Sequence, residues 1–313
     1  MNKIDYSPIQ TLLAADNRII RTGLRQAFTF AGFNGEAFTE AGTLEALSSA
    51  IEETSFDLII VSAELGGAFV APIIIAMRDG RLPHHPFPIV IMLLADGNPD
   101  LVRNVAAAGA DHIMLLPVAP GPMLKCIDHF VVGRMPFVVT VDYVGPDRRI
   151  APRLGCASAP HVSVPNPIAA RIRNTPLAEI QSQIDLTRLE LSTLKLRSYA
   201  GCLLAIDKTA TNMFLRGKIE PPKLEFFTRS LDRIRVSFPF CCDDLCCTDV
   251  DPRTLGALSD LSADIEAIMH EDPSFDRARL DEFRTNCHVV ADDLKQIISG
   301  KAMTTNEVRS KQA

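Results

Sequence analysis

The feature that most constrains the fold is an alternation of short apolar runs with longer helical patterns over residues 9–133. The runs are rich in β-branched residues, as are strands buried on both faces of a parallel sheet. They lie at 9–14, 58–61, 89–94 and 113–116, with a weaker fifth at 35–38. The helical patterns lie at 18–31, 43–54, 69–79, 98–108 and 120–131. This order predicts an α/β fold, a doubly wound five-stranded parallel sheet, whose site should lie at the carboxyl ends of its strands.

The rest of the chain is predicted to hold a linker, a helical domain and a tail. Residues 134–174 are rich in proline and contain one strand pattern, so we expect a linker that partly packs on the first domain, residues 1–133. Residues 175–300 carry the apolar stripes of four helices, the last ending at Gly300, which favours an all-α bundle. Residues 301–313 are expected to be a disordered tail.

The first predicted helix of that bundle is long. No proline interrupts residues 177–220, and a helix unbroken to Arg216 would span about 60 Å at a rise of ~1.5 Å per residue. Such a helix either bends near Gly201 or pairs with another chain. We expect a homodimer through an apolar seam on this helix. The seam residues are Leu177, Ile180, Ile184, Leu191 and Leu194.

Composition and charge limit the function. Hydrophobic residues make up 47% and charged residues 22%, as in soluble globular proteins, and no apolar run reaches the ~18 residues that span a bilayer. No signal peptide is recognisable, so we expect a cytoplasmic protein with reduced thiols. The net charge is −6, but residues 165–240 carry 12 basic and 7 acidic side chains. We favour neutralisation within the domain. The alternative is a transcriptional or RNA-binding regulator that uses basic helices at 171–235.

Six short motifs occur in order along the predicted sheet domain. They are LLAADN at 12–17, AGF at 31–33 with EAL at 45–47, DLIIV at 57–61, PIVIMLLA at 88–95, AGAD at 108–111 and LP at 116–117. Together they resemble the receiver domain of bacterial two-component response regulators. The resemblance implies a cis peptide before Pro117, and a partner-docking or dimer face formed by residues 98–131.

The same resemblance shows which receiver residues are replaced. In that family an acidic pair holds Mg²⁺, a third carboxylate accepts the phosphoryl group, and a Thr or Ser and a Lys sense it. The matching positions here are Ala15 and Asp16 for the pair, Ser62 for the acceptor, Leu94 for the hydroxyl and Leu116 for the lysine. A leucine cannot pair with a phosphate, and one carboxylate is a poor Mg²⁺ site. The sequence therefore predicts a pseudo-receiver: a phosphorylation-independent adaptor that docks an unknown protein partner, with no enzymatic activity, metal or cofactor.

Two further patterns leave alternatives open. Four cysteines, Cys241, Cys242, Cys246 and Cys247, could hold zinc or an Fe–S cluster, but their spacing is not Cys-x-x-Cys, and use as small apolar residues is favoured. Three arginines, Arg148, Arg149 and Arg153, resemble half of the cyclic-di-GMP site of PilZ domains. The second half of that site is absent, so we favour a solvated basic turn or a docking strip.

A histidine in the helical region permits a third hypothesis. His288 lies on the last predicted helix, where a phosphotransferase would carry its phosphorylated histidine. The residues after it, VVAD, lack the lysine and glycine of the phosphotransfer pattern. We therefore favour an ordinary surface histidine.

Overall fold

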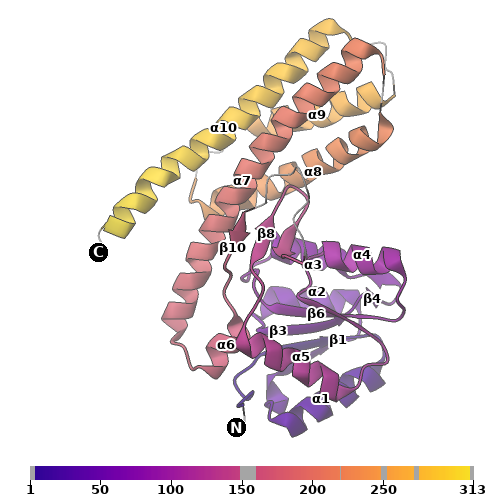
Figure 1. The fold of residues 1–313 in the computed structure, drawn as a ribbon, viewed down its shortest axis with the longest axis vertical. Coiled ribbons are helices and arrows are strands. Elements are labelled where there is room, and N and C mark those ends of the chain that lie inside the picture. The colour runs from indigo at the N-terminus through magenta and orange to yellow at the C-terminus, as the bar shows by residue number, and fades with distance from the viewer. Residues whose placement is uncertain (1–3, 149–159, 219, 248–251, 271–274, 311–313) are drawn as a thin grey trace. The chain divides into compact units, whose positions relative to one another are not determined.

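The structure is a computed structural model that describes residues 4–148, 160–218, 220–247, 252–270 and 275–310 (Figure 1). The chain divides into two compact units. The α/β unit comprises Met1–Val138 and Tyr143–Arg188, and the helical unit comprises Val139–Asp142 and Leu189–Ala313. Each unit is described by itself below. Within the described part of the chain, no helix has the length and apolarity needed to cross a bilayer.

The α/β unit contains the predicted five-stranded parallel sheet. Its strands are β1 (Thr11–Ala14), β2 (Phe38–Ala41), β3 (Leu58–Ser62), β6 (Ile89–Leu94) and β7 (His112–Leu115), in the spatial order β2-β1-β3-β6-β7. This order confirms the doubly wound fold and reverses direction between β1 and β3, where such sheets open a crevice at their carboxyl edge. A small antiparallel hairpin of β4 (Glu64–Leu65) and β5 (Ala68–Phe69) follows β3.

The second strand begins later than the sequence predicts. The run 35–38 is mostly a 3₁₀ turn, Gly35–Ala37, and β2 starts only at Phe38. The side chain of Asn34 accepts a hydrogen bond from the backbone N–H of Glu36 at 3.0 Å, which holds the turn. A side-chain cap therefore outweighs the weak strand pattern at this point.

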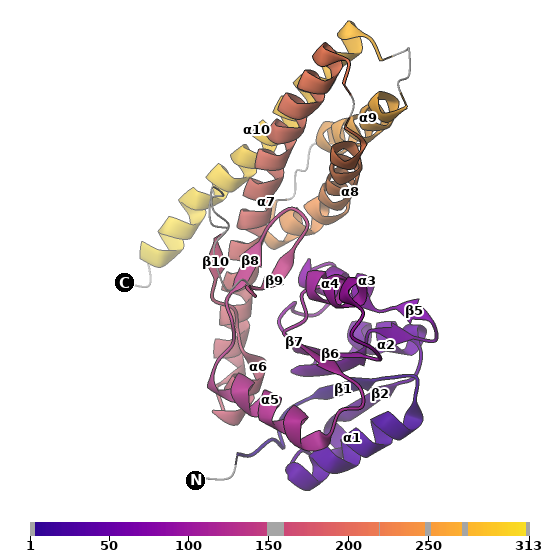
Figure 2. The ribbon, with the colours of Figure 1, turned by 45° about the vertical axis from the view of Figure 1, so that its right-hand side comes forward.

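Helices cover both faces of the sheet, as Figure 2 shows. Helices α1 (Arg18–Ala31) and α5 (Pro120–Val132) pack on one face, around Leu13 and Ile60. Helices α2 (Leu44–Glu53), α3 (Ala71–Arg78) and α4 (Pro99–Ala107) pack on the other face, around Leu12 and Ile59. Successive strand residues thus enter opposite cores, which is the two-residue period of a strand buried on both sides.

The segment predicted as a linker is folded where the structure describes it. Strands β8 (Phe137–Val139), β9 (Val144–Pro146) and β10 (His161–Val162) form a three-stranded sheet, and helix α6 (Pro167–Ile172) follows. Phe137 is fully buried, with the guanidinium of Arg134 4.7 Å from its ring centre. A proline-rich segment stays an unfolded linker only when none of its side chains packs against the domain. In this segment, buried aromatic and polar side chains anchor the chain. The α/β unit therefore extends past residue 133, to Arg188.

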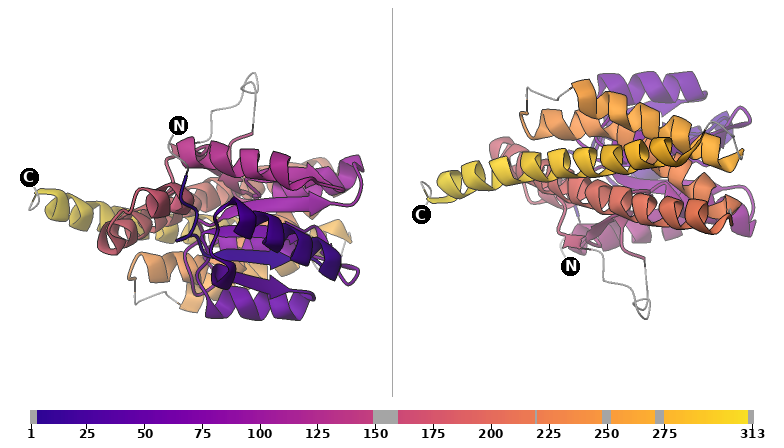
Figure 3. Two further views of the ribbon diagram at one scale, coloured as in Figure 1. Left: turned by 90° about the horizontal axis from the view of Figure 1, so that it is seen from below. Right: turned by 90° about the horizontal axis from the view of Figure 1, so that it is seen from above.

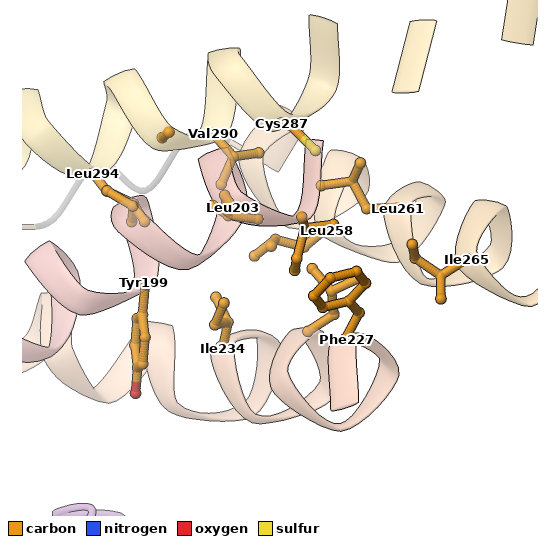
Figure 4. Packing of buried hydrophobic residues seen from close by; sticks show 14 of the residues in the cluster. Tyr199, Leu203, Phe227, Ile234, Leu258, Leu261, Ile265, Cys287, Val290 and Leu294 are labelled. Atoms are coloured by element: carbon orange, nitrogen blue, oxygen red, sulfur yellow. The ribbon is translucent and has the colours of Figure 1, made fainter. Parts of the chain in front are cut away.

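The helical unit is built on α7 (Leu177–Arg216) from Leu189 onward, and on α8 (Pro221–Asp244), α9 (Pro252–Met269) and α10 (Arg277–Ser310). Helix α9 packs against both α8 and α10 (Figure 3). All four helices contribute to one apolar core, in which Leu203, Phe227, Leu258 and Leu294 lie (Figure 4).

Two glycines of this unit, Gly201 and Gly300, lie inside helices. Helix α7 runs unbroken through Gly201, and α10 continues past Gly300 to Ser310, which differs from the disordered tail that the sequence predicts. A single glycine inside a helix costs only about 1 kcal/mol relative to alanine. Without a proline or a left-handed cap beside it, a glycine is therefore a weak stop signal.

Candidate functional site

The five positions matched to the receiver site lie at one edge of the sheet. Ala15 and Asp16 follow β1, Ser62 ends β3, Leu94 ends β6 and Leu116 follows β7. Because these four strands are parallel neighbours in the order β1-β3-β6-β7, their carboxyl ends meet at the same edge. The fold thus brings together residues that are 101 positions apart in sequence, since 116 − 15 = 101. We call this edge the mouth of the sheet.

Apolar side chains fill much of the mouth. Leu94 is fully buried and belongs to the core on the α2, α3 and α4 face, together with Val61. Leu116 is half-buried and packs against the core on the α1 and α5 face. Ala15 and Ser62 are buried as well. The positions where a receiver carries a hydroxyl and a lysine therefore belong to hydrophobic packing here.

The one remaining acidic residue of the pair has a local role. Asp16 is exposed, and its carboxylate accepts a hydrogen bond from the backbone N–H of Asn17 at 2.8 Å. Throughout the residues that the structure describes, no three His, Cys, Asp or Glu side chains gather in a way that could hold a metal ion. One monodentate carboxylate beside apolar groups offers Mg²⁺ few of the six oxygen ligands that it prefers.

The structure adds a residue at the mouth that the sequence analysis missed. Arg21, in the first turns of α1, donates hydrogen bonds to the backbone carbonyls of Ala15 and Asp16, the latter at 3.2 Å. Its Nε atom lies 3.4 Å from a carboxylate oxygen of Glu40 in β2. Arg21 therefore ties the loop after β1 to the neighbouring strand. An arginine one turn beyond Asp16 was the only sequence signal for this contact.

The peptide bond before Pro117 is cis, as the receiver resemblance implies. Beside it lies an apolar groove of about 510 Å³ between α1 and the segment after β7. Ile19 and Gly23 line it from α1, and Leu116 and Val118 line it from the opposite side. All residues that line the groove are apolar or glycine. Such grooves are typical of sites that receive an apolar side chain of a partner.

Two exposed apolar side chains lie on the same face of α1 as this groove. Ile19 is 81% exposed and Phe30 is 92% exposed. At 100° per residue, Ile19, Gly23, Gln26 and Phe30 fall on one face of the helix, so the polar Gln26 lies between the groove and Phe30. We call the groove together with Phe30 the α1 surface. The docking face expected from sequence is 98–131, and the α1 surface overlaps that range only at residues 116–120.

The arginine pattern after β9 is only partly described. Arg148 donates a hydrogen bond to the carbonyl of Ala110, which precedes β7. Arg149 and Arg153 lie outside the described residues. Arg148 thus helps to hold the small sheet in place, and it does so through a backbone carbonyl.

The predicted seam residues do not form one exposed stripe. Leu177 is 69% exposed, but Leu191 is 3% exposed and Ile184 is also buried, while Ile180 and Leu194 are half-buried. The same spacing that serves a seam between two chains also serves packing within one chain. Homodimerisation therefore remains a prediction without an assigned seam.

The four clustered cysteines lie at the end of α8. Cys241 and Cys242 are buried in the helical core, Cys247 is half-buried and Cys246 is exposed. Cys246 has a φ of 49°, so the chain turns away from the helix axis there and separates its side chain from the buried pair. Burial raises the pKa of the Cys242 thiol to about 12, which leaves it protonated and unreactive.

His288 is paired with a carboxylate in the helical unit. Its Nε2 atom lies 3.3 Å from Asp207 of α7, and Arg284, one turn earlier on α10, lies 3.2 Å from the same side chain. Asp207 also accepts a hydrogen bond from Thr211 at 3.2 Å. His288 is thus one member of a polar cluster that joins α7 to α10, and the phosphotransferase hypothesis stays untested.

No protein-family model matches the chain, and no curated relative matches it. Among solved structures, a response regulator from Burkholderia pseudomallei is 17% identical, with a TM-score of 0.32, over 37% of this chain and 64% of its own. Response regulator DrrB of Thermotoga maritima is 18% identical, with a TM-score of 0.34, over 40% of this chain and 54% of its own. A CheY-like receiver domain protein from Methanospirillum hungatei is 22% identical, with a TM-score of 0.34, over 38% of this chain and 90% of its own.

The chain therefore spans less than two thirds of the first two of these proteins, at 64% and 54%. The matches concern about two fifths of this chain, at identities of 17–22%. Two of these neighbours are described as response regulators, and the third is described as a response regulator receiver domain protein.

Proposed function

We propose that this chain is a two-component signalling adaptor of the cytoplasm that works without phosphorylation and without enzymatic activity, through a pseudo-receiver that docks a protein partner. One observation carries this proposal: at the mouth of the sheet, Leu94 is buried in one hydrophobic core and the half-buried Leu116 packs against the other. A phosphoryl group bound there would lose its water shell and gain no cation or donor from these side chains, and that desolvation is costly.

The direct test exposes the full chain to acetyl phosphate or beryllofluoride with Mg²⁺. We expect no phosphorylated species by intact-mass spectrometry and no chemical-shift change at Asp16 or Ser62 by NMR. The matched control is the variant Ala15→Asp, Ser62→Asp, Leu94→Thr and Leu116→Lys, which returns acid, hydroxyl and lysine to the mouth. Beryllofluoride binding by the unaltered chain would overturn the proposal.

The docking part of the proposal rests on the α1 surface. Ile19 and Phe30 are both highly exposed, and Ile19 lines the apolar groove. Helix α1 carries three arginines and no acidic residue; Arg21 and Arg25 both pair with Glu40 of β2, at 3.4 and 3.2 Å, and Arg18 in the first turn is exposed. We therefore assign this surface to an amphipathic helix of a partner protein, whose apolar stripe enters the groove and whose acidic flank faces α1.

This assignment is tested with a photo-crosslinking residue at position 30 in the full chain. We expect a crosslinked partner segment with helical apolar spacing and acidic flanks, and loss of the adduct in the Ile19→Ser variant. Phe69→Ser is the matched control, because Phe69 is another exposed phenylalanine, in β5. A basic or extended partner segment, or equal loss in both variants, would remove the α1 surface from the proposal.

A further inference from the structure

The helical unit contains a basic hollow that the adaptor function does not use. It has a volume of about 420 Å³ and lies at the turn between α7 and α8. Its charged and amide side chains are Lys208, Asn212, Arg216, Lys218, Glu220 and Lys223. Positions 208, 212 and 216 are four residues apart on α7, so they share one helix face. Gly217, with a φ of 58°, then turns the chain and places Lys218 at the hollow.

Most of the positive charge in this hollow is uncompensated. Lys223 pairs with Glu220, with Nζ and Oε2 2.7 Å apart. Among the described residues, Lys208, Arg216 and Lys218 have no ion-pair partner. Three cations thus converge on one hollow that contains a single carboxylate, already engaged. Like charges this close repel one another when the hollow holds only water, so a bound anion would relieve that repulsion.

The side chains, and not the helix ends, supply this charge. The carboxyl end of α7 and the amino end of α8 meet at the turn, and their dipoles have opposite sign there, so they offset each other. A guanidinium with several ammonium groups around it is the donor set that proteins use for phosphate oxygens. The Asn212 amide, which also lines the hollow, donates to the carbonyl of Lys208 at 2.9 Å.

The surroundings favour a small ligand over a long polyanion. The volume lies at the lower end of the ~300–1,000 Å³ of small-molecule sites. Further along α8 the exposed cations alternate with acids: Glu225 follows Lys223, and Asp232 pairs with Arg235 at 3.4 Å. A nucleic-acid backbone needs a continuous basic track, which these acids interrupt.

We propose that the hollow bounded by Lys208, Arg216, Lys218 and Lys223 is a binding site for a small phosphate-bearing anion of nucleotide size. Arg216 and Lys218 bind the phosphate oxygens, and Lys208 and Lys223 complete the positive rim. This site is independent of the mouth of the sheet and of the adaptor proposal. It would make the helical unit responsive to a phosphorylated small molecule.

The test is calorimetric titration of the full chain with pyrophosphate and with adenosine triphosphate, at physiological salt. We expect binding of at least one of them, weakened at least tenfold by the double variant Arg216→Gln, Lys218→Gln. Both residues are exposed and unpaired, so the variant should keep the unaltered melting temperature. The matched control is Arg229→Gln, Arg235→Gln, which removes the same charge from α8, outside the hollow, and should change affinity less than twofold.

Three outcomes would overturn the proposal. The first is that neither phosphate compound binds the unaltered chain. The second is that both double variants weaken binding equally, because the effect would then follow net charge alone. The third is that a 20-nucleotide single-stranded RNA binds more tightly than either compound and responds equally to both variants, since that describes a diffuse polyanion surface.

Discussion

Arg134 donates a hydrogen bond from Nε to Asp111 Oδ1 at 2.8 Å, and both side chains are almost fully buried. A second guanidinium, that of Arg78, reaches Asp111 Oδ2 at the same distance of 2.8 Å. Arg134 also donates to the backbone carbonyls of Phe87 and Pro165. One carboxylate thus joins α3, the start of β7 and the segment after α5, which holds the small sheet onto the α/β unit.

This pair predicts a large loss of stability on substitution. Arg134→Leu leaves part of the Asp111 charge and two carbonyls without a partner, and we expect the unfolding free energy to fall by about 3 kcal/mol. The measurement is urea denaturation followed by circular dichroism. Arg103→Leu is the control, because its ion pair with Asp100 is exposed and should contribute less than about 1 kcal/mol. Equal effects would show that the buried network contributes little.

The apolar packing at the mouth predicts that substitutions at two neighbouring strand ends, Leu94 and Ser62, will differ in their effect on stability. Leu94→Thr removes buried methyl groups and adds a hydroxyl to an apolar core, so we expect a loss of about 3 kcal/mol. Ser62→Ala should change stability by less than about 1 kcal/mol, since it removes a single small polar atom from a buried position and leaves the Cβ in place. The unfolding midpoints of both variants give the comparison. A neutral Leu94→Thr would mean that water already enters the mouth.

A histidine near the buried network predicts acid sensitivity. Burial, and then the charges of Arg134, Arg78, His84 and Arg171, lower the pKa of His85 to about 4. Its Nδ1 accepts a hydrogen bond from the backbone N–H of Phe87 at 3.1 Å, so the neutral ring is the form that the fold requires.

The sign of the pH effect follows from that pKa. The unfolded chain takes up a proton near pH 6.5 and the folded chain only near 4. Stability is therefore complete above about pH 6.5 and falls by up to about 3 kcal/mol as the pH drops toward 4. The variant His85→Asn keeps an acceptor for the backbone N–H of Phe87 but does not titrate. As the pH falls from 7 to 4, the unfolding free energy of the unaltered chain should therefore drop by up to about 3 kcal/mol relative to that of the variant. A constant difference from pH 7 to 4 would contradict the prediction.

The cysteines at the end of α8 predict selective thiol chemistry. Cys246 is exposed, whereas burial raises the pKa values of Cys242 and Cys287. We expect iodoacetamide to modify Cys246 at least about 100-fold faster than either buried thiol in the folded chain, read out by peptide mass spectrometry. A bound zinc ion would instead protect Cys246 with Cys241, Cys242 and Cys247, and a chelator would release all four together.

Much of the fold could be predicted from sequence because it depends on local pattern. The strand runs at 58–61 and 89–94 became β3 and β6, and the helix expected at 18–31 is α1 without a change of bounds. The hydrophobic residues of a strand recur every two positions and those of a helix every 3.6, so a short stretch of sequence is enough to recognise either. When parallel strands are joined by helices, only a few sheet topologies are possible. The apolar residues at the mouth, such as Leu94 and Leu116, were also visible in sequence.

Only the tertiary structure decided which polar and apolar groups found partners. Asp111 and Arg134 are 23 positions apart, and each alone could have been an exposed charge in a loop. Likewise, spacing on α7 could not tell the exposed Leu177 from the buried Leu191, nor could the pattern of α1 reveal the groove beside Pro117. Periodicity determines which way a side chain points along its own element, but the partner that it meets depends on distant parts of the chain.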